Sequence, residues 1–473
     1  MKKFYIHCAI PYVNAKPHIG HALEFIQTDT IARYHRLLGE DVLMLSGGDE
    51  NALKNVQAAE AAGEDLQTFV DKNAKLFQDL AENLNAKFDV FQKGSDKKYH
   101  YPSSQKLWQL CNGAGDIYKK SYRGLYCVGC ELFYAPDELD ENGECFEHPG
   151  KKLEEVEEEN YFFRLSKYQD KLIQIIESGE YEITPESRKH EVLSFLKSGL
   201  QDISISRTNE RAKNWGVPVP EDPTQRIYVW FDALNIYQSG VGFGWDDEKY
   251  DKWWPADLQV IGKGILRFHA IYWPAFLLSA GLKLPKKLFV HEYFTVNGQK
   301  MSKTLGNVYD PIPLVEKYGA DPLRYFCLAK ISPFQDGDFS EEKFKESYNS
   351  DLANGLGNLV ARVAKLCEKF NIGITYKPKD FYPEVEKLLS QYKFNEAISY
   401  ICSQITEADK KINEEKPWLL AEGNTANIVL TYLSKKIIDI SFNLQPFLPE
   451  TAEKILKQFS GEIKSAPPLF PRI

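Results

Sequence analysis

Two histidines stand three residues apart near the start of the chain, in the segment PYVNAKPHIGHALEF (residues 11–25). His18 and His21 flank Gly20 at the expected start of a helix, where residues three apart share one face. The first turn of a helix favours anions, so two imidazoles there could donate hydrogen bonds to phosphate oxygens. Gly20 has no side chain and would let a ligand approach the backbone closely. Because surface His-x-x-His pairs without a role are common, this pair alone does not establish a phosphate site.

Two lysines form a second candidate site in the segment NGQKMSKTLGN (residues 297–307). Lys300 and Lys303 bracket Met-Ser in a glycine-flanked loop that follows an expected strand. Flexible lysines can reach a polyphosphate as point charges, although such a loop by itself is more often a solvated turn. The histidine and lysine motifs, about 280 residues apart, are far more specific as a pair.

Three cysteines and one histidine have the spacing of a metal site. Cys127-x-x-Cys130 and Cys145-x-x-His148 are separated by fourteen residues, which is close to a Cys₃His zinc knuckle. All four ligands would come from the protein, so the expected zinc is structural and not catalytic. The alternative is a chance grouping of thiols.

Composition narrows the class of protein. The chain has 473 residues, too many for one core, so two to four domains are expected. It is 43% hydrophobic, which indicates a globular protein. No apolar run reaches the roughly 18 residues of a membrane span, and the first residues lack a signal peptide. We therefore expect a cytoplasmic protein whose eight cysteines are thiols or metal ligands. The net charge of −9 argues against indiscriminate nucleic-acid coating but permits a local basic patch.

The elements that must position these residues follow a βαβ pattern at the start. Residues 3–10 predict a buried strand, a helix runs from His18 to Gly39, and residues 41–51 predict a second strand. This is the opening of a doubly wound parallel sheet, in which ligands bind outside the carboxyl ends of the strands. His18, His21 and Asp49 all fall on that side.

The rest of the chain predicts a split sheet followed by helices. Residues 52–112 are expected to be mostly helical, and the acidic run LEEVEEEN within 113–165 to be a solvated face. From about residue 351 to 470 the pattern predicts a helical bundle. Three later segments are expected to be strands that resume the sheet: 225–234, 258–265 and 287–296.

The two phosphate motifs on a split parallel sheet resemble the class I aminoacyl-tRNA synthetases. Neighbouring blocks narrow the resemblance to the methionyl-tRNA synthetase family, and it covers almost the whole chain, from Phe4 to Ile473. The blocks, in order, are AIPYVNAKPHIGH, YVWFDAL, FHAIYWPA, FVHEYFTVNGQKMSKT, QDGDFSEEKF, DLANGLGNL and EEKPWLL.

This resemblance implies an α/β fold: a split Rossmann-type parallel sheet with a zinc-knuckle insertion, followed by an α-helical anticodon-binding bundle. The implied domains are the first half of the Rossmann catalytic domain (1–112), the connective insertion with the zinc knuckle (113–225), the second half (226–296), the lysine loop and stem-contact region (297–350) and the helical anticodon-binding domain (351–473).

The implied activity is that of a methionine–tRNA ligase. Methionine and ATP would form methionyl-adenylate and pyrophosphate, and the methionyl group would pass to tRNA(Met), including the initiator tRNA. Catalysis would rest on positioning and charge stabilisation. Mg²⁺ would accompany ATP, and one structural Zn²⁺ would be bound per chain. The implied ATP-binding residues are His18, Gly20, His21, Lys300 and Lys303, of which the histidines and lysines are catalytic.

A methionine pocket is also implied by the resemblance. Aromatic walls suit the polarizable thioether, Tyr12 or His291 could donate a hydrogen bond to the sulfur, and Asp49 would pair with the substrate ammonium. Without the family, the aromatic residues would be interpreted as ordinary core. The matching side-chain pocket is Ile10, Tyr12, Trp230, Ala233, Tyr237 and His291.

The C-terminal helices supply the implied anticodon contacts. Asn358 and Arg362 are four residues apart, share a helix face, and could hydrogen-bond base edges. Trp418 could stack on an unpaired base; alternatively, it packs a helix end.

The chain departs from the family pattern in four places. Asn51-Ala52 replaces the His-Gly of the usual DEHG, Gly264 replaces an aspartate that resembles an ATP ribose contact, and Thr304 replaces a serine. The sequence also ends at PLFPRI, before the extra dimerising domain of many relatives, so a monomer is expected.

Other functions are also compatible with part of the pattern. A sister synthetase for leucine, isoleucine or valine would need a large editing domain, and a cysteine enzyme would use its zinc to bind the substrate thiol. A nucleotidylyltransferase with the same histidine motif would lack the helical domain and the zinc insertion. A tRNA-binding homologue without activity is disfavoured by the intact histidines and lysines, although Gly264 weakly favours it.

Overall fold

The computed structural model describes residues 2–127, 132–134, 139–145, 150, 152–301, 307–419 and 424–473. Contacts divide the chain into two compact units. The first comprises Met1–Pro17, Gly39–Leu80 and Lys87–His291, and the second His18–Leu38, Ala81–Ala86 and Glu292–Ile473. Each unit is thus assembled from segments that are distant in the sequence.

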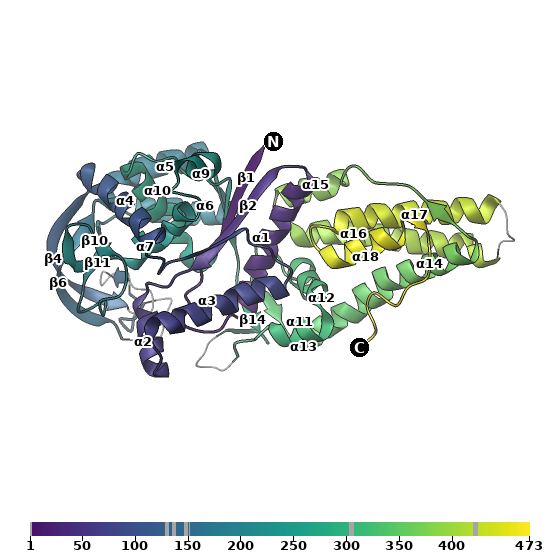
Figure 1. Cartoon of the computed structure of the whole chain (residues 1–473), viewed down its shortest axis with the longest axis horizontal. Helices are drawn as coiled ribbons and strands as arrows, with labels where there is room; N and C mark the ends of the chain where they lie inside the picture. The colour runs from purple at the N-terminus through teal and green to yellow at the C-terminus, as the bar shows by residue number, and fades with distance from the viewer. Residues whose placement is uncertain are drawn as a thin grey trace. The chain divides into compact units, whose positions relative to one another are not determined.

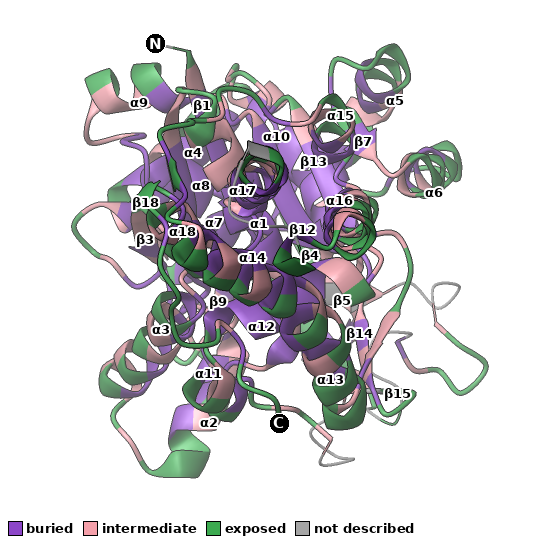
Figure 2. Ribbon diagram, turned by 90° about the vertical axis from the view of Figure 1, so that its right-hand side faces the viewer, coloured by how far each residue is buried: buried purple, intermediate pink, exposed green. Residues whose placement is uncertain are grey.

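A six-stranded sheet organises the first unit, with the strand order β3-β2-β1-β12-β13-β7 and every pairing parallel. This confirms the predicted α/β class. It also confirms the strands predicted before the insertion, β1 and β2, and those predicted after it, β12 and β13. Figure 2 shows that β12 and β13 are buried, as expected for a parallel sheet covered on its faces. The strands are β1 (Lys3–Cys8), β2 (Asp41–Gly48), β3 (Val90–Lys93), β7 (Glu182–Thr184), β12 (Leu258–Gly262) and β13 (Lys287–His291).

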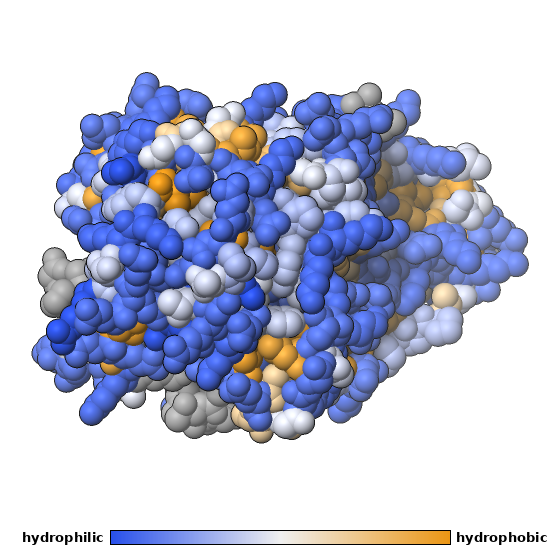
Figure 3. Space-filling view, turned by 60° about the vertical axis from the view of Figure 1, so that its left-hand side comes forward, coloured by the Kyte–Doolittle hydropathy of each residue, from blue (hydrophilic) through white to orange (hydrophobic). Residues whose placement is uncertain are grey.

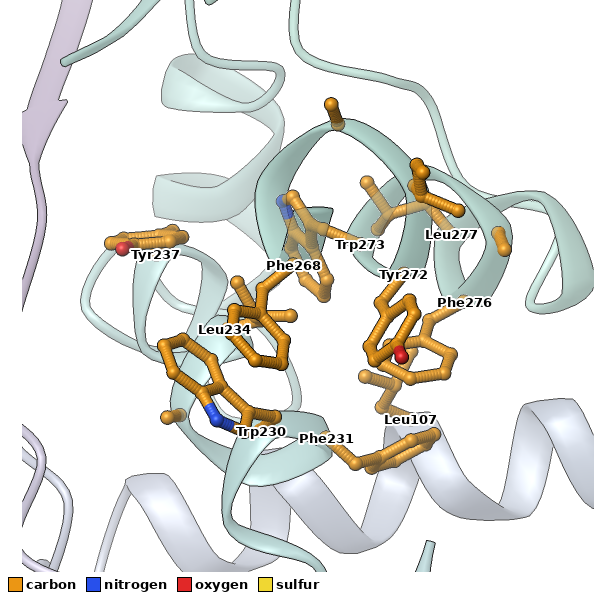
Figure 4. Packing of buried hydrophobic residues seen from close by; sticks show 14 of the residues in the cluster. Leu107, Trp230, Phe231, Leu234, Tyr237, Phe268, Tyr272, Trp273, Phe276 and Leu277 are labelled. Atoms are coloured by element: carbon orange, nitrogen blue, oxygen red, sulfur yellow. The ribbon is translucent and has the colours of Figure 1, made fainter. Parts of the chain in front are cut away.

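Helices pack on this sheet around a largely aromatic core. Phe231 lies 4.6 Å from Phe276 and 5.7 Å from Trp108, measured between ring centroids. Figure 4 shows Phe231 and Phe276 pointing toward one another. The helices α2 and α3 follow β2, with bounds Leu53–Ala62 and Leu66–Asn83. The others are α4 (His100–Gly113), α5 (Gln169–Ser178), α6 (Glu186–Lys197), α7 (Val229–Leu234), α8 (Ile236–Ser239), α9 (Asp247–Trp253) and α10 (Trp273–Ser279).

The prediction that residues 225–234 form a strand of the parallel sheet is wrong. β11 (Asp222–Ile227) pairs antiparallel with β9 (Ser206–Thr208) and β10 (Pro218–Val219) in a separate small sheet. Val229–Leu234 is the helix α7, and all six of its residues are buried. A short segment that is buried on every side carries no period that distinguishes a helix from a strand.

The expected insertion contains an antiparallel sheet and one strand of the parallel sheet. β4 (Ile117–Cys127), β5 (Leu132–Tyr134), β6 (Glu154–Phe163) and β8 (Ile203–Ser204) pair in the order β5-β4-β6-β8. The acidic run lies on β6, where most of the glutamates are exposed, as predicted. β7 lies within 113–225 but pairs with β13.

The second unit combines α1 (Ile19–Leu37) with a small sheet and helices. The sheet order is β15-β14-β16 (Gln299–Lys300, Phe294–Val296 and Gly337–Phe339). Beyond residue 351 the described chain is mostly helical, and α14, α16, α17 and α18 lie side by side (Figure 1). The helices are α11 (Ile312–Tyr318), α12 (Ala320–Tyr325), α13 (Glu341–Ser347), α14 (Asn358–Lys369), α15 (Pro383–Ser390), α16 (Phe394–Glu415), α17 (Asn424–Leu444) and α18 (Pro449–Gln458), with β17 (Gly373–Ile374) and β18 (Gly461–Glu462) as a short strand pair.

A buried ion pair joins α1 to α12 within the second unit. Arg324 Nη1 lies 2.7 Å from Asp29 Oδ2, and neither side chain is exposed. The guanidinium also donates to the backbone oxygens of Phe447, at 2.8 Å, and Pro446, at 3.0 Å. Removing one partner of a buried pair typically costs about 3–5 kcal/mol, so this contact firmly anchors α1 to the C-terminal part of the chain.

The surface drawn in Figure 3 is mostly hydrophilic, with separate hydrophobic areas. None of the helices in the described ranges combines the length and the apolar character that a membrane span requires.

Candidate active site

The two histidines of the first motif form the cap of α1. Gly20 N–H donates to His18 Nδ1 at 3.1 Å, and His18 N–H donates to His21 Nδ1 at 3.1 Å. This reciprocal arrangement is a capping box, with imidazoles in place of the usual hydroxyl and carboxylate. Because both Nδ1 atoms accept backbone hydrogens, the remaining proton of each neutral ring is on Nε2. The cap therefore fixes the tautomer in which both rings are donors at Nε2, as phosphate oxygens require.

The described residues on either side of the lysine loop contact the start of α1. A Cβ built on Gly20 would lie 3.4 Å from Met301 Cε, and Ile19 N–H donates to Tyr309 O at 3.0 Å. Met301 follows Lys300 directly, so the described beginning of the lysine motif lies beside the histidine motif within the second unit. The Lys300 side chain and all of Lys303 lie outside the described residues.

Gly20 is restricted by its neighbours. A Cβ at this position would lie only 2.9 Å from His18 Cε1, a separation that real Cβ atoms do not show. A side chain here would displace the His18 ring from the cap, so packing favours glycine at this position.

The predicted pocket residues of the first unit gather at the carboxyl ends of its strands. Tyr12 and Asp49 form a parallel bridge beyond β1 and β2, and Asp49 is only 3% exposed. Tyr12 lies edge-on to Trp230, with 6.2 Å between ring centroids. His291 ends β13 beside Gly262 of β12. Ile10 packs against the core, and Ala233 is buried on α7.

Phe268 and His269 complete the aromatic cluster, although sequence reasoning did not select them. Trp230 and Phe268 are stacked, with 3.7 Å between centroids and 4° between planes, and Figure 4 shows the two rings face to face near Tyr237. Tyr237 OH lies 2.8 Å from His269 Nε2. The block FHAIYWPA, which carries both residues, was the available signal.

Burial keeps the histidines of this cluster neutral. His7 stacks on Tyr237 at 3.7 Å between centroids, and burial lowers the pKa of His7 well below its ordinary value. Burial also lowers the pKa of His269 to about 4. His269 Nδ1 lies 3.0 Å from Ile265 O and so carries the proton, while Nε2 accepts from Tyr237. The cluster is therefore aromatic, and its two histidines are uncharged.

Comparison with known proteins identifies the family. A sequence-family model described as tRNA synthetases class I (M), where M stands for methionine, matches residues 4–364. The methionine–tRNA ligase of Thermotoga maritima is 43% identical, over 98% of this chain and 76% of its own length, and that of Rhizobium meliloti is 42% identical, over 96% and 91%. The chain belongs to the methionyl-tRNA synthetase family. A solved structure of the Mycobacterium tuberculosis methionyl-tRNA synthetase in complex with methionyl-adenylate matches with a TM-score of 0.92, 38% identity and full coverage of both chains.

Asn51, one of the expected departures from the family pattern, holds the loop that carries Asp49. Its Nδ2 donates to Gly94 O at 2.8 Å and to Asp232 Oδ2 at 2.6 Å. The other Asp232 oxygen lies 2.8 Å from His100 Nε2. Asn51 thus forms a partly buried link between the loop and α7, which bears Trp230. Gly264, the second departure, lies in the short helical turn Lys263–Ile265 after β12.

Glu50, the neighbour of Asp49, is a buried carboxyl group. Its Oε2 accepts from the Ser95 N–H at 2.9 Å and from the Ser95 hydroxyl. Burial raises the pKa of Glu50 from an ordinary 4.5 to about 7. A carboxyl group with a raised pKa destabilises the folded state progressively as pH rises from about 4.5 to about 7, because the unfolded chain ionises first.

Glu50→Gln is therefore expected to gain stability relative to the wild type as pH rises. Glutamine keeps an acceptor for Ser95 but does not ionise. Between pH 5 and pH 8 the difference in unfolding free energy, variant minus wild type, should increase by about 2–3 kcal/mol. Urea unfolding at several pH values measures this difference. A constant difference across that range would show that Glu50 does not titrate as inferred.

Two of the four predicted zinc ligands are among the residues that the structure describes. Cys127 and Cys145 are buried, and their Sγ atoms are 3.2 Å apart. Cys130 and His148 lie outside the described residues. Among the residues that are described, no group of three metal ligands is present.

The predicted anticodon residues lie in the second unit. Asn358 is exposed at the start of α14. The Arg362 guanidinium carbon lies 5.8 Å from the centre of the Trp418 ring, and its nitrogens bind Asp409, at 2.8 Å, and Asn413, at 2.7 Å. An open groove of about 500 Å³ is lined by Arg362, Lys365, Leu366, Glu368, Lys369 and Trp418.

Proposed function

We propose that the chain activates L-methionine with ATP, forming methionyl-adenylate and pyrophosphate, and transfers methionine to tRNA(Met), including the initiator tRNA. The single observation that best supports this is the imidazole capping box of α1, flanked by both ends of the lysine loop. Family membership selects methionine among the amino acids.

The chemistry requires no side-chain nucleophile. A carboxylate oxygen of methionine attacks the α-phosphorus of ATP, and the bond from that phosphorus to the bridging oxygen of pyrophosphate breaks. His18 and His21 would donate from Nε2 to phosphate oxygens as negative charge develops, while Lys300 and Lys303 would bind the leaving pyrophosphate. Mg²⁺ bound with ATP would neutralise further phosphate charge. Gly20 would let the nucleotide approach the backbone.

The methionine pocket would be formed by the aromatic cluster of the first unit. Trp230, Phe268 and Tyr237 offer apolar walls to the thioether, and stacking of this kind suits sulfur. Asp49 would bind the α-ammonium in a buried position. Of the two residues expected to reach the sulfur, Tyr12 has its ring at the edge of Trp230, and His291 lies at the end of β13.

ATP–pyrophosphate exchange assayed against each of the twenty amino acids tests this function. Methionine alone should drive rapid exchange, and tRNA(Met) should then be charged. Exchange with another amino acid at a comparable rate would refute the specificity. Exchange without charging of tRNA would instead favour a nucleotidyl-transferring relative.

A structural zinc is proposed at the cysteine cluster, held by Cys127, Cys130, Cys145 and His148. The described pair fits this role. A separation of 3.2 Å between sulfurs exceeds the roughly 2.05 Å of a disulfide and is near the ~3.8 Å between two sulfurs of a tetrahedral zinc with Zn–S bonds of about 2.3 Å. Such a metal would stabilise the insertion and take no part in the reaction.

Cys145→Ala is expected to reduce the zinc content from one per chain to almost none and to lower the melting temperature, because structural zinc contributes directly to folding. Exchange should fall only in proportion to the folded fraction. Metal analysis and thermal unfolding provide the measurements. Cys402→Ala, which removes a thiol outside the cluster, should leave both unchanged. Absence of zinc from wild-type protein purified without chelators would contradict the assignment.

An anticodon site is proposed at the groove beside α14. Arg362 and Trp418 line it together with Lys365 and Lys369, so a stacking surface adjoins positive charge. Trp418 is 39% exposed, which leaves part of the indole accessible to a base. Asn358 is exposed four residues before Arg362 on the same helix, in keeping with a role in reading base edges.

Trp418→Ala is expected to leave ATP–pyrophosphate exchange unchanged and to weaken charging of tRNA by roughly 1–3 kcal/mol, the contribution of one base stack. Steady-state kinetics of both reactions measure the two effects separately. Tyr376→Ala is a matched control, since Tyr376 is also 39% exposed in the second unit. Equal losses of exchange and charging in Trp418→Ala would indicate that Trp418 is a packing residue.

A further inference from the structure

Two side chains of α16 hold the guanidinium of Arg362, which belongs to α14. Its Nη1 donates to Asp409 Oδ1 at 2.8 Å, and its Nη2 donates to Asn413 Oδ1 at 2.7 Å. Asp409 and Asn413 are four residues apart and share a face of α16, and Asn413 Nδ2 donates to Asp409 Oδ2 at 3.1 Å. A planar guanidinium with a separate acceptor on each terminal nitrogen is fixed in orientation. We call Asp409 and Asn413 the clamp of Arg362.

The clamped guanidinium lines the groove beside α14, whereas Asp409 and Asn413 do not. Trp418 lines the groove as well, with its ring centre 5.8 Å from the guanidinium carbon. The Nε hydrogen of Arg362, and the second hydrogen on each of its terminal nitrogens, donate to none of the described residues. Arg362 therefore keeps donors for a ligand beside the indole, and the clamp can act on that ligand only through Arg362.

The clamp also changes the charge that the groove presents. Its carboxylate offsets the charge of Arg362, whereas Lys365 and Lys369 line the groove with no ion-pair partner in the part of the chain that the structure describes. Glu368, the acidic residue of the lining, accepts hydrogen bonds from Ser465 N–H, at 3.3 Å, and from its hydroxyl. Phosphates attract any cation, but base edges require directed donors. Lysines suit phosphates, and an oriented guanidinium whose charge is offset suits a base edge.

The clamp contributes little to the free energy of unfolding, because the Arg362 side chain is 31% exposed and that of Asp409 is 41% exposed. We propose that Asp409 and Asn413 determine anticodon specificity as positioning residues: they orient the Arg362 guanidinium and offset its charge, so that it recognises a base edge and not the RNA backbone. This inference rests on the proposed anticodon site. An ordinary surface ion pair between α14 and α16 is the competing explanation.

The test measures how tightly the full chain binds tRNA(Met), and the same tRNA with each anticodon base replaced in turn, at several salt concentrations. Asp409→Asn keeps an acceptor for Arg362 but removes the charge. It should reduce the discrimination, the ratio of the two dissociation constants, about tenfold, within the range for one base contact. It should also steepen the dependence of log Kd on log salt by about 0.7, the contribution of one added phosphate contact to a single strand. Asp409→Glu should keep the wild-type slope, and Asn413→Ala should reduce discrimination without changing the slope.

Glu407→Gln is the matched control, because Glu407 pairs from α16 with Lys436 of α17 and lies outside the groove lining; it should change neither quantity. In an Arg362→Met chain, Asp409→Asn should have no further effect on discrimination, since the clamp acts through the guanidinium. Thermal unfolding establishes that each variant is folded.

Both changes are required of Asp409→Asn. An unchanged ratio, an unchanged slope, or equal weakening of every tRNA would overturn the proposal and leave an ordinary ion pair between two helices. A wild-type chain that bound tRNA(Met) and its anticodon variants equally would instead refute the proposed anticodon site itself, so the two failures are distinguishable.

Discussion

Replacing His21 with alanine is expected to reduce the rate of ATP–pyrophosphate exchange by about 10²–10³-fold, the usual loss when one preorganised donor to a developing oxyanion is removed. The capping box holds His21 in the tautomer that donates from Nε2, so no reorganisation is needed when the phosphate charge develops. Pre-steady-state formation of methionyl-adenylate, with binding of tRNA as a separate measurement, checks the result: tRNA should still bind.

The cap itself requires a second variant, because alanine also removes the acceptor for His18 N–H. His21→Glu keeps an acceptor at the third helical position, where capping boxes favour glutamate, but places a negative charge where phosphate is expected. Exchange should fall at least as far, while helix content and melting temperature remain close to the wild type. His35→Ala, in the last turn of the same helix, is the matched control. Substantial exchange by His21→Glu would disprove phosphate binding by His21.

Replacing Asp49 with alanine is expected to raise the KM for methionine by the equivalent of about 2–5 kcal/mol, because the substrate ammonium is left without its buried partner. Asp49→Asn, which preserves shape and removes only the charge, should show much of this loss. The KM for ATP should change little. Exchange kinetics with each substrate varied in turn provide the measurement.

Asp41→Asn serves as the control for this change, since Asp41 lies at the other end of β2 and pairs with Lys252. A methionine KM that stays at the wild-type value in Asp49→Asn would mean that the ammonium binds elsewhere. The bridge of Asp49 to Tyr12 would then be purely structural.

The opening βαβ unit was predictable because each of its signals is local. A continuous apolar run predicted β1, an apolar period ending at Gly39 predicted α1, and the observed bounds agree within a few residues. The histidine motif could be placed at the helix start for the same reason. The role of the two histidines as the helix cap could not be predicted, because Ser, Thr, Asp and Asn are the preferred cap residues. Only the structure shows which ring nitrogen accepts the backbone hydrogen.

Features that depend on tertiary contacts could not be predicted from the sequence. β7 has three residues, too few for a period, and becomes a strand only through its pairing with β13. His7 lies within an apolar strand, so the sequence alone predicts an ordinary core residue. Its stacking on Tyr237 is visible only in the structure. Lys54 and Tyr12 are distant in sequence, so nothing local predicts their contact. The resemblance supplied most of the site, and the structure added the groups that position it.

The ion pair between Asp29 and Arg324 has a consequence for anyone who wishes to build chimeras from this chain. The helix that begins beside His18 is locked to α12 and to the turn before α18, although Asp29 and Arg324 are 295 positions apart in the sequence. A graft that exchanges only the segment after residue 351 would replace the turn whose backbone oxygens, at Pro446 and Phe447, accept from the guanidinium. Those contacts would persist only where the new turn kept the same backbone position. A hybrid expected to fold should exchange His18–Leu38 and Ala81–Ala86 together with Glu292–Ile473, treating three separate stretches of sequence as one transplantable module.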